Sequence, residues 1–113
     1  MPKITKIFKV KTGADGEYET SQTVNPPGFW DYNITATAKL IAPADTTING
    51  VLEITAANGS TDNPSKKFSI TTGETANLGK WELDGGDNTI KVSGATEPVR
   101  ADTNVEIEVT AEV

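Results

Sequence analysis

Residues 30–40, Trp30-Asp31-Tyr32-Asn33-Ile34-Thr35-Ala36-Thr37-Ala38-Lys39-Leu40, show the fold of this chain most plainly. Apolar or aromatic residues alternate strictly with polar ones along this stretch. A period of two is that of a β-strand, whose successive side chains point to opposite faces. The C-terminal stretch from Asn104 to Val113 repeats the pattern, with Val and Ile alternating with Glu and Thr. Both stretches are typical of antiparallel sheets that have one face in a core and the other in solvent.

Six further stretches are predicted as weaker strands, at residues 3–11, 17–24, 48–57, 66–71, 77–83 and 88–93. Turn signals rich in Gly, Pro, Asn and Asp separate them, including a lone glycine at Gly94. No window has helical periodicity longer than a turn or two. Eight short strands predict an all-β fold, a single antiparallel β-sandwich domain over residues 1–113. Jelly-roll and immunoglobulin-like topologies share this pattern, so both remain open.

The composition argues against most enzymes. The 113 residues include no Cys and no His, which removes the thiolate nucleophile and the usual general base. Two carboxylates could still hydrolyse a glycoside, but they need a deep cleft, which a small sandwich with its acids in turns and on solvent faces hardly provides. We expect no enzyme.

Charge and hydropathy also restrict the partners. Ten basic residues against sixteen acidic ones give a net charge of −6, which disfavours DNA or RNA as a partner. No apolar run approaches the roughly 18 residues of a membrane span. Lysines interrupt the first eleven residues, so this stretch lacks the apolar region of a signal peptide. We therefore expect the chain to be made in the cytoplasm without a signal peptide.

The two ends of the chain carry opposite charge. The first predicted strand contains Lys3, Lys6, Lys9 and Lys11, and the last contains Glu106, Glu108 and Glu112. Cross-strand Lys–Glu pairs would fix the register of two paired strands. The same complementarity could join two subunits; pairing within one chain is the favoured interpretation. The four lysines are also candidate partner-binding residues.

Two aromatic residues are candidate ligand- or partner-binding residues. Trp81 lies between Lys80 and Glu82 just before a turn, which suggests an open position. Phe29 follows Pro26-Pro27-Gly28 at the exit of a loop, where exposed aromatic residues often serve contacts. Such residues could stack on sugar rings. Trp30 and Tyr32 share a face with Ile34 and Leu40, which favours the core for both.

The loop Asp84-Gly85-Gly86-Asp87-Asn88 is a candidate calcium site. Its two carboxylates, Asp84 and Asp87, are ligands that Ca²⁺ prefers, and its glycines allow tight wrapping. The alternative is an ordinary Gly-rich hairpin connection, which the absence of an EF-hand spacing favours. We expect no other cofactor.

Residues 79–92, Gly-Lys-Trp-Glu-Leu-Asp-Gly-Gly-Asp-Asn-Thr-Ile-Lys-Val, resemble the late hairpin of jelly-roll modules such as galactose-binding-like and other carbohydrate-binding modules. The resemblance covers about a third of the chain and implies a jelly roll with glycan binding, without assigning any residue. The composition as a whole, rich in Thr, Ala, Asn and Gly, is similar to that of small phage virion proteins, such as head decoration, tail and fibre proteins. That likeness implies other protein subunits as partners, a homo-oligomer or larger assembly, and a place on the virion surface. The sequence therefore predicts a non-enzymatic structural or assembly protein, and a carbohydrate-binding module with exposed aromatics as the alternative.

Overall fold

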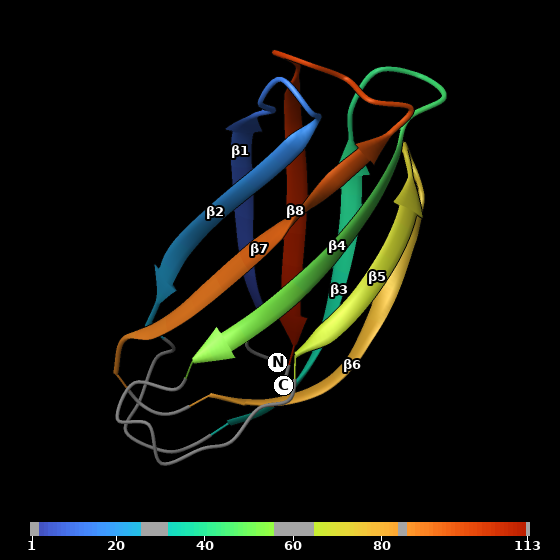
Figure 1. The fold of residues 1–113 in the computed structure, drawn as a ribbon. Helices are drawn as coiled ribbons and strands as arrows, with labels where there is room; N and C mark the ends of the chain where they lie inside the picture. The colour runs from blue at the N-terminus through green and yellow to red at the C-terminus, as the bar shows by residue number, and fades with distance from the viewer. Residues whose placement is uncertain (1–2, 26–31, 56–64, 84–85, 113) are drawn as a thin grey trace.

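The computed structural model describes residues 3–25, 32–55, 65–83 and 86–112 (Figure 1). These residues form eight β-strands and no helix. The strands are β1 (Lys3–Lys11), β2 (Glu17–Val24), β3 (Tyr32–Ile41), β4 (Thr47–Thr55), β5 (Lys66–Thr71), β6 (Thr75–Leu83), β7 (Asn88–Glu97) and β8 (Asn104–Glu112). The predicted all-β sandwich is confirmed. With no helix in the described ranges, none of them provides a helix that could span a membrane.

The strands form two four-stranded antiparallel sheets. We call β2-β7-β4-β5 the front sheet, since it faces the viewer in Figure 1, and β1-β8-β3-β6 the back sheet. Strands β1 and β8, β2 and β7, β3 and β6, and β4 and β5 pair as in one long hairpin whose tip lies between β4 and β5. The hairpin is rolled up, so that β8 also pairs with β3 and β7 with β4. This is the strand order of a jelly roll, which decides between the two topologies left open by the sequence.

Each strand contributes alternate side chains to one core between the sheets. Among the described residues, twenty apolar side chains from both sheets are buried there, including Phe8, Leu40, Leu52, Trp81 and Ile107. At roughly 1.5–3 kcal/mol for each large apolar side chain, this burial supplies the main stabilisation of a domain without disulfides.

The predicted pairing of the two ends of the chain is confirmed. β1 and β8 are antiparallel neighbours, with Lys3 opposite Glu112 and Lys9 opposite Glu106. The complementary charges therefore meet within one chain.

Strand β7 runs four residues past its predicted end. The sequence pattern takes Gly94 as a turn signal, but the strand continues through it to Glu97. Gly94 pairs with Gly50 of β4 and with Tyr18 of β2. A Cβ atom at Gly94 would overlap the Asn49 carbonyl oxygen and lie 2.6 Å from the Gly50 Cα. The glycine is needed here because two backbones approach closely, not because the chain turns.

Trp81 is buried, against the prediction that it is open. Only 1% of its surface is exposed, and its indole N–H donates to the Leu78 carbonyl at 3.0 Å. The register of β6 against β3 shifts between Ala36 and Thr37, opposite Gly79, whose φ is +81°. This irregularity lets Leu78 and Trp81, three residues apart, both face the core. The polar neighbours of Trp81 lie on the opposite face, as they do beside any inward-facing strand residue.

Candidate functional site

The outer face of the back sheet carries the lysines of β1. Alternation places Lys9 and Lys11 on this face, both exposed, while Lys6 is half-buried on the opposite side of the strand, opposite Val109. The four predicted lysines therefore do not share one face. Lys3 stands in register with Glu112. Ile7, 44% exposed, lies next to Lys9 on the outer face.

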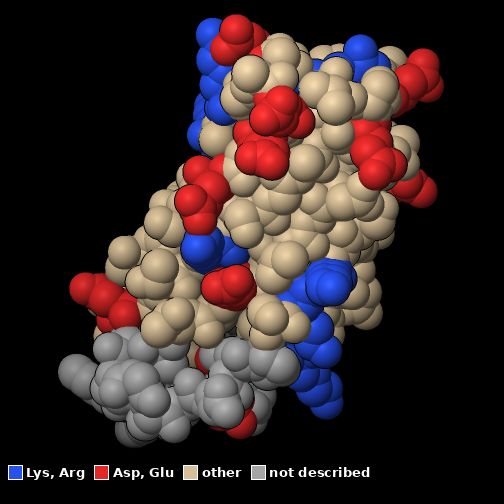
Figure 2. Space-filling model, viewed as in Figure 1, with Lys and Arg blue, Asp and Glu red and all other residues tan. Residues whose placement is uncertain are grey.

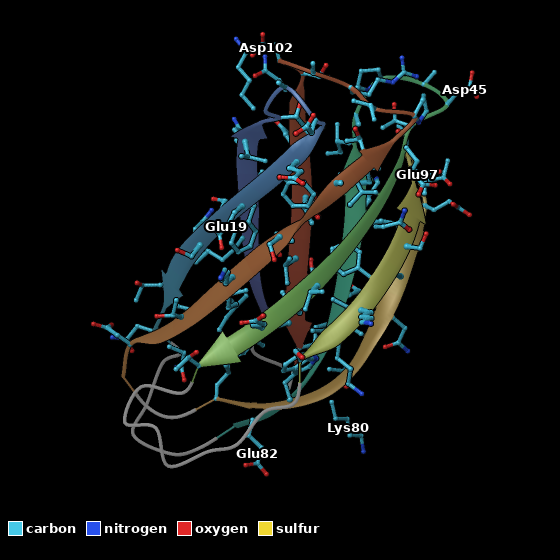
Figure 3. All side chains as sticks on the ribbon, viewed as in Figure 1. Glu19, Asp45, Lys80, Glu82, Glu97 and Asp102 are labelled. Atoms are coloured by element: carbon cyan, nitrogen blue, oxygen red, sulfur yellow. The ribbon has the colours of Figure 1, made fainter. Side chains whose placement is uncertain are left out.

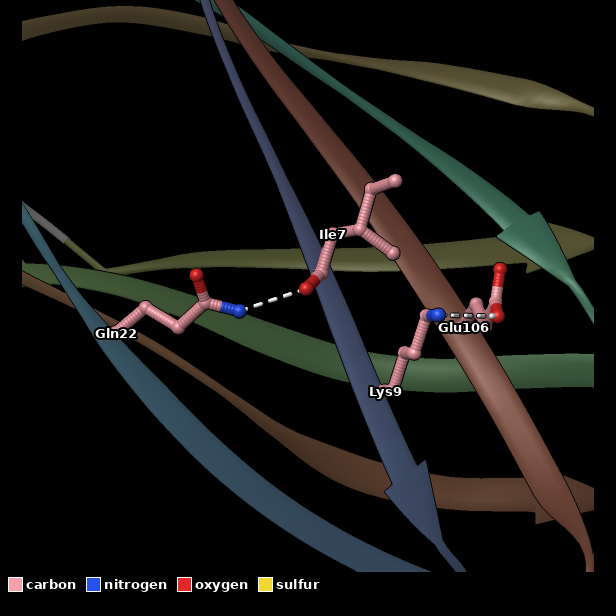
Figure 4. A network of polar contacts seen from close by, with 4 residues as sticks. All are labelled: Ile7, Lys9, Gln22 and Glu106. Carbon is pink, nitrogen blue, oxygen red and sulfur yellow. Dashed lines mark hydrogen bonds and ion pairs between the residues drawn. The ribbon is translucent and has the colours of Figure 1, made fainter.

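Lys9 forms an ion pair with Glu106 of β8 (Figure 4). The Lys9 Nζ atom lies 3.8 Å from the Glu106 Oε1 atom, and the Lys9 side chain is 73% exposed. Pairs this exposed contribute about 0–1 kcal/mol. The pair supports the β1–β8 register but leaves the ammonium group accessible to a partner.

Gln22 of β2 reaches across the open side of the sandwich to β1. Its side-chain N–H donates to the Ile7 carbonyl at 2.7 Å (Figure 4). β1 is an edge strand whose neighbour in the back sheet is β8. A carbonyl of β1 that points away from β8 therefore points to the free edge of the sheet. Gln22 therefore occupies one of the main-chain acceptors on the β1 edge, where an added strand would otherwise pair.

The loop between β7 and β8 crosses the upper end of the molecule in Figure 1 and is held by side-chain hydrogen bonds. The buried Thr12 hydroxyl donates to the Arg100 carbonyl and accepts from the Thr103 N–H at 2.9 Å. The Arg100 N–H donates to the Thr96 hydroxyl at 2.9 Å. Between these anchors Val99 is 64% exposed. An apolar side chain is thus held in solvent by a well-fixed loop.

The upper end is acidic. Figure 3 places Asp45, Glu97 and Asp102 there, and all three side chains are exposed. The Arg100 guanidinium donates from Nη2 to the Ala44 carbonyl at 3.4 Å, which joins the β3–β4 loop to the β7–β8 loop. Figure 2 shows several acidic side chains at this end, with basic ones beside them at the upper left and a further basic group at the lower right.

A hollow of about 590 Å³ opens on the outer face of the front sheet. Its floor is the backbone around the paired glycines Gly50 and Gly94, and its walls, from β4, β5 and β7, are mostly apolar. The outward side chains around it are Asn49, Val51, Lys67, Ser69 and Ser93. The hollow exists because these side chains, apart from Lys67, are short.

Lys67 also borders a smaller hollow of about 340 Å³, between β5 and β6. Lys66 lines it as well, with its Nζ 3.8 Å from the position of a Cβ on Gly79. The two exposed lysines thus form a basic rim beside the larger hollow. On the far side of β4, Lys91 is already engaged: its hydrogen bond to Glu19, with an Nζ–Oε1 distance of 2.7 Å, raises the pKa of Lys91, as does the charge of Glu53.

Tyr18 lies under the glycine pair, on the core side of the front sheet. Its hydroxyl is buried without a hydrogen-bond partner among the described atoms, and a Cβ at Gly50 would overlap it. Burial raises the pKa of the Tyr18 phenol well above its ordinary value. Tyr18 therefore fills space, with Phe68 on the other side of Gly50, and it does not reach the outer hollow.

The predicted calcium loop is described only in part. Asp84 lies outside the described residues, whereas Asp87 is exposed and its Oδ1 accepts a 3.2 Å hydrogen bond from the Asn25 side chain. Within the described ranges, no three acidic side chains gather in a way that could hold a metal ion. Calcium binding at Asp84 and Asp87 stays a prediction.

Of the two aromatic candidates, Trp81 is buried and cannot stack on a ligand. Phe29 lies outside the described residues. Every aromatic side chain that the structure describes is buried: Phe8, Tyr18, Phe68 and Trp81. Sequence reasoning missed the hollow of the front sheet, although two glycines inside strands are a signal of close backbone approach.

No family model, curated protein or solved structure matched the chain. Its function is therefore argued from these surfaces alone.

Proposed function

We propose that the chain is a non-enzymatic structural protein that acts through contacts with other protein subunits, as a component of a phage virion. The observation that carries the proposal is the outer side of β1. This edge strand presents the exposed Ile7, Lys9 and Lys11 in succession along its outer side.

An apolar side chain followed by two lysines on an edge strand suits a protein partner with an acidic surface. Lysines on an edge discourage indiscriminate strand pairing and at the same time attract an opposite charge. Electrostatic complementarity of this kind gives orientation and association rate more than affinity. Because Ile7 is 44% exposed, its complete burial would contribute about 1 kcal/mol of binding free energy.

The test is a charge reversal, since deletion of β1 would remove the fully buried Phe8 and unfold the core. The test variant is Lys11→Glu, and the control is Lys39→Glu. Both change the net charge by the same amount on the outer face of the back sheet, but Lys39 lies on the interior strand β3. Particles are purified after lysis of the cells that encode the chain, and the amount of the chain in them is measured. We expect the wild-type chain and the Lys39→Glu chain in equal amounts, and less of the Lys11→Glu chain. Absence of the wild-type chain from the particles would refute the virion role, and equal incorporation of both variants would refute the role of β1.

The second proposal is a carbohydrate-binding module that uses exposed aromatics. Since Trp81 is buried, its aromatic platform would have to come from Phe29 or from another side chain outside those described. A screen against diverse glycans at millimolar concentration tests it, and the absence of any binding would reject it.

A further inference from the structure

The chain carries a fixed apolar projection. Val99 is 64% exposed, and the neighbouring Pro98 is exposed too. The loop that carries them is held on both sides, by the Thr96 hydroxyl on the Arg100 N–H and by the Thr12 hydroxyl on the Arg100 carbonyl and the Thr103 N–H. A loop that is already ordered loses little conformational entropy when it binds. Pro98 and Val99 form what we call the loop tip.

The chain also carries a receptacle of matching chemistry. The hollow over Gly50 and Gly94 is mostly apolar, open to solvent and about 590 Å³ in volume, enough for two residues of a loop. It is shallow rather than enclosed, which suits an inserted loop better than a small molecule that must be surrounded. Val51 offers the hollow an apolar wall on the β4 side.

The charges around the two surfaces are opposite. Exposed Glu97 precedes the loop tip in sequence, and Arg100, whose guanidinium donates to the Ala44 carbonyl, follows it. The exposed Asp45 and Asp102 lie at the same end of the molecule (Figure 3). Lys67 lines the hollow and Lys66 stands beside it. Figure 2 shows acidic side chains in the upper part of this face, beside basic ones at the upper left, and a further basic group at the lower right. Opposite charges around an apolar contact fix its orientation.

The two surfaces belong to one chain but cannot meet within it. The loop tip lies at the upper end of the domain, where its hydrogen bonds to Thr12 and Thr96 hold it. The hollow lies on the flat of the front sheet, over Gly94 in the middle of β7. The surfaces meet only between copies.

We propose that the loop tip of one copy, Pro98 and Val99, docks in the front-sheet hollow of a second copy, with Glu97 of the first facing Lys67 of the second. The contact is head-to-tail, so repetition builds rings or filaments rather than a closed symmetric dimer. It rests on the proposed assembly function and adds a self-contact separate from the β1 surface.

The first experiment measures the mass of the purified chain by light scattering over a range of concentrations. We expect the mass of the wild type to exceed the 12.0 kDa of a monomer and to rise with concentration. Val99→Asp removes the apolar contact, and Ser69→Trp fills the hollow. Each weakens self-association on the order of tenfold to a hundredfold, the range expected for one buried aliphatic side chain. The matched controls are Ile41→Asp, at an apolar residue 42% exposed on the back sheet, and Ser21→Trp, at an exposed serine of β2 away from the hollow. Both controls associate like the wild type.

A charge exchange separates docking from misfolding. Glu97→Lys and Lys67→Glu each weaken self-association alone, because each brings like charges together. When the two variants are mixed, the loop tip of the Glu97→Lys chain, now basic, faces the acidic rim of the Lys67→Glu chain, and association returns. Recovery in the mixture cannot arise from two misfolded chains.

Three outcomes would overturn the proposal. If the wild type stays at the monomer mass, the proposed self-contact is refuted. The proposed assembly function is then still tested by incorporation into particles. Association that Lys11→Glu abolishes and Val99→Asp leaves intact assigns the self-contact to β1 instead. Glycan binding that Ser69→Trp abolishes and Val99→Asp leaves unchanged assigns the hollow to a sugar.

Discussion

Replacing Gly94 by alanine should destabilise the domain strongly, although alanine adds a single methyl group. The new Cβ would overlap the Asn49 carbonyl oxygen and lie 2.6 Å from the Gly50 Cα, about 0.8 Å short of the 3.4 Å at which ordinary contact begins. Relief requires β4 and β7, the two central strands of the front sheet, to separate by at least that amount, because the Asn49 carbonyl oxygen is closer still. An amide–carbonyl hydrogen bond stretched this far is lost, at about 1 kcal/mol each for two local bonds, and overpacking adds about 1–3 kcal/mol.

The expected loss is therefore about 3–5 kcal/mol from a total that is typically about 5–15 kcal/mol for one domain. Urea unfolding followed by tryptophan fluorescence measures it, with the buried Trp81 as a reporter. The control is Gly13→Ala, whose Cβ would meet only the Glu17 carbonyl at 3.8 Å. That variant should be neutral or gain about 0.4–1 kcal/mol through a less flexible unfolded chain. A loss below about 1 kcal/mol for Gly94→Ala would show that the strands do not approach as described.

Two further predictions concern groups near the sheet edge and the core. Gln22→Ala frees the Ile7 carbonyl on the β1 edge, so we expect more self-association in light scattering and no more than about 1 kcal/mol of lost stability; an unchanged mass would mean that Gln22 does not guard the edge. Because burial raises the pKa of Tyr18, the unfolded chain releases its phenolic proton before the folded chain does, and stability falls as the pH rises above the ordinary value of about 10, by at most about 1.4 kcal/mol per pH unit. Tyr18→Phe removes this part of the alkaline loss and costs little at neutral pH, since the hydroxyl has no partner in the described part of the chain; the same alkaline slope in both proteins would contradict the burial of Tyr18.

The strands could be predicted from the sequence because a period of two is a local signal. Lys3–Lys11, Glu17–Val24 and Lys66–Thr71 have the predicted bounds. Gly94 and Trp81 were misread for the same physical reason: their environment is set by a neighbouring strand. Gly94 resembles a turn until Gly50 is placed opposite it, and Trp81, between two charged residues, resembles an exposed position until the pairing of β6 with β3 places it on the core face with Leu83.

The candidate surfaces were predictable in part. The lysines of β1 were found in the sequence as a charge pattern. The number of charges does not show that alternation places Lys6 on the opposite face of the strand from Lys9 and Lys11. The hollow could not be found, because it combines Gly50, Gly94 and Ser69 from three strands far apart in the sequence. Val99 carries no sequence signal either, since its exposure depends on how Thr12 and Thr96 hold its loop.

The rolled-up hairpin also determines which surfaces are left for partners. Because it places β1 beside β8, the opposite charges of the two chain ends face each other and are partly satisfied within the domain, as Lys9 and Glu106 show. The same winding puts β5 and β6 at the opposite open side, where the rim lysines Lys66 and Lys67 border the hollow. The acidic groups of the loops at the upper end are separated from those lysines by the length of the strands. The lysine rim suits the proposed end-to-side contact with Glu97 of a second copy, and a long principal axis of 42 Å against 23 and 19 Å makes such contacts compatible with extended assemblies.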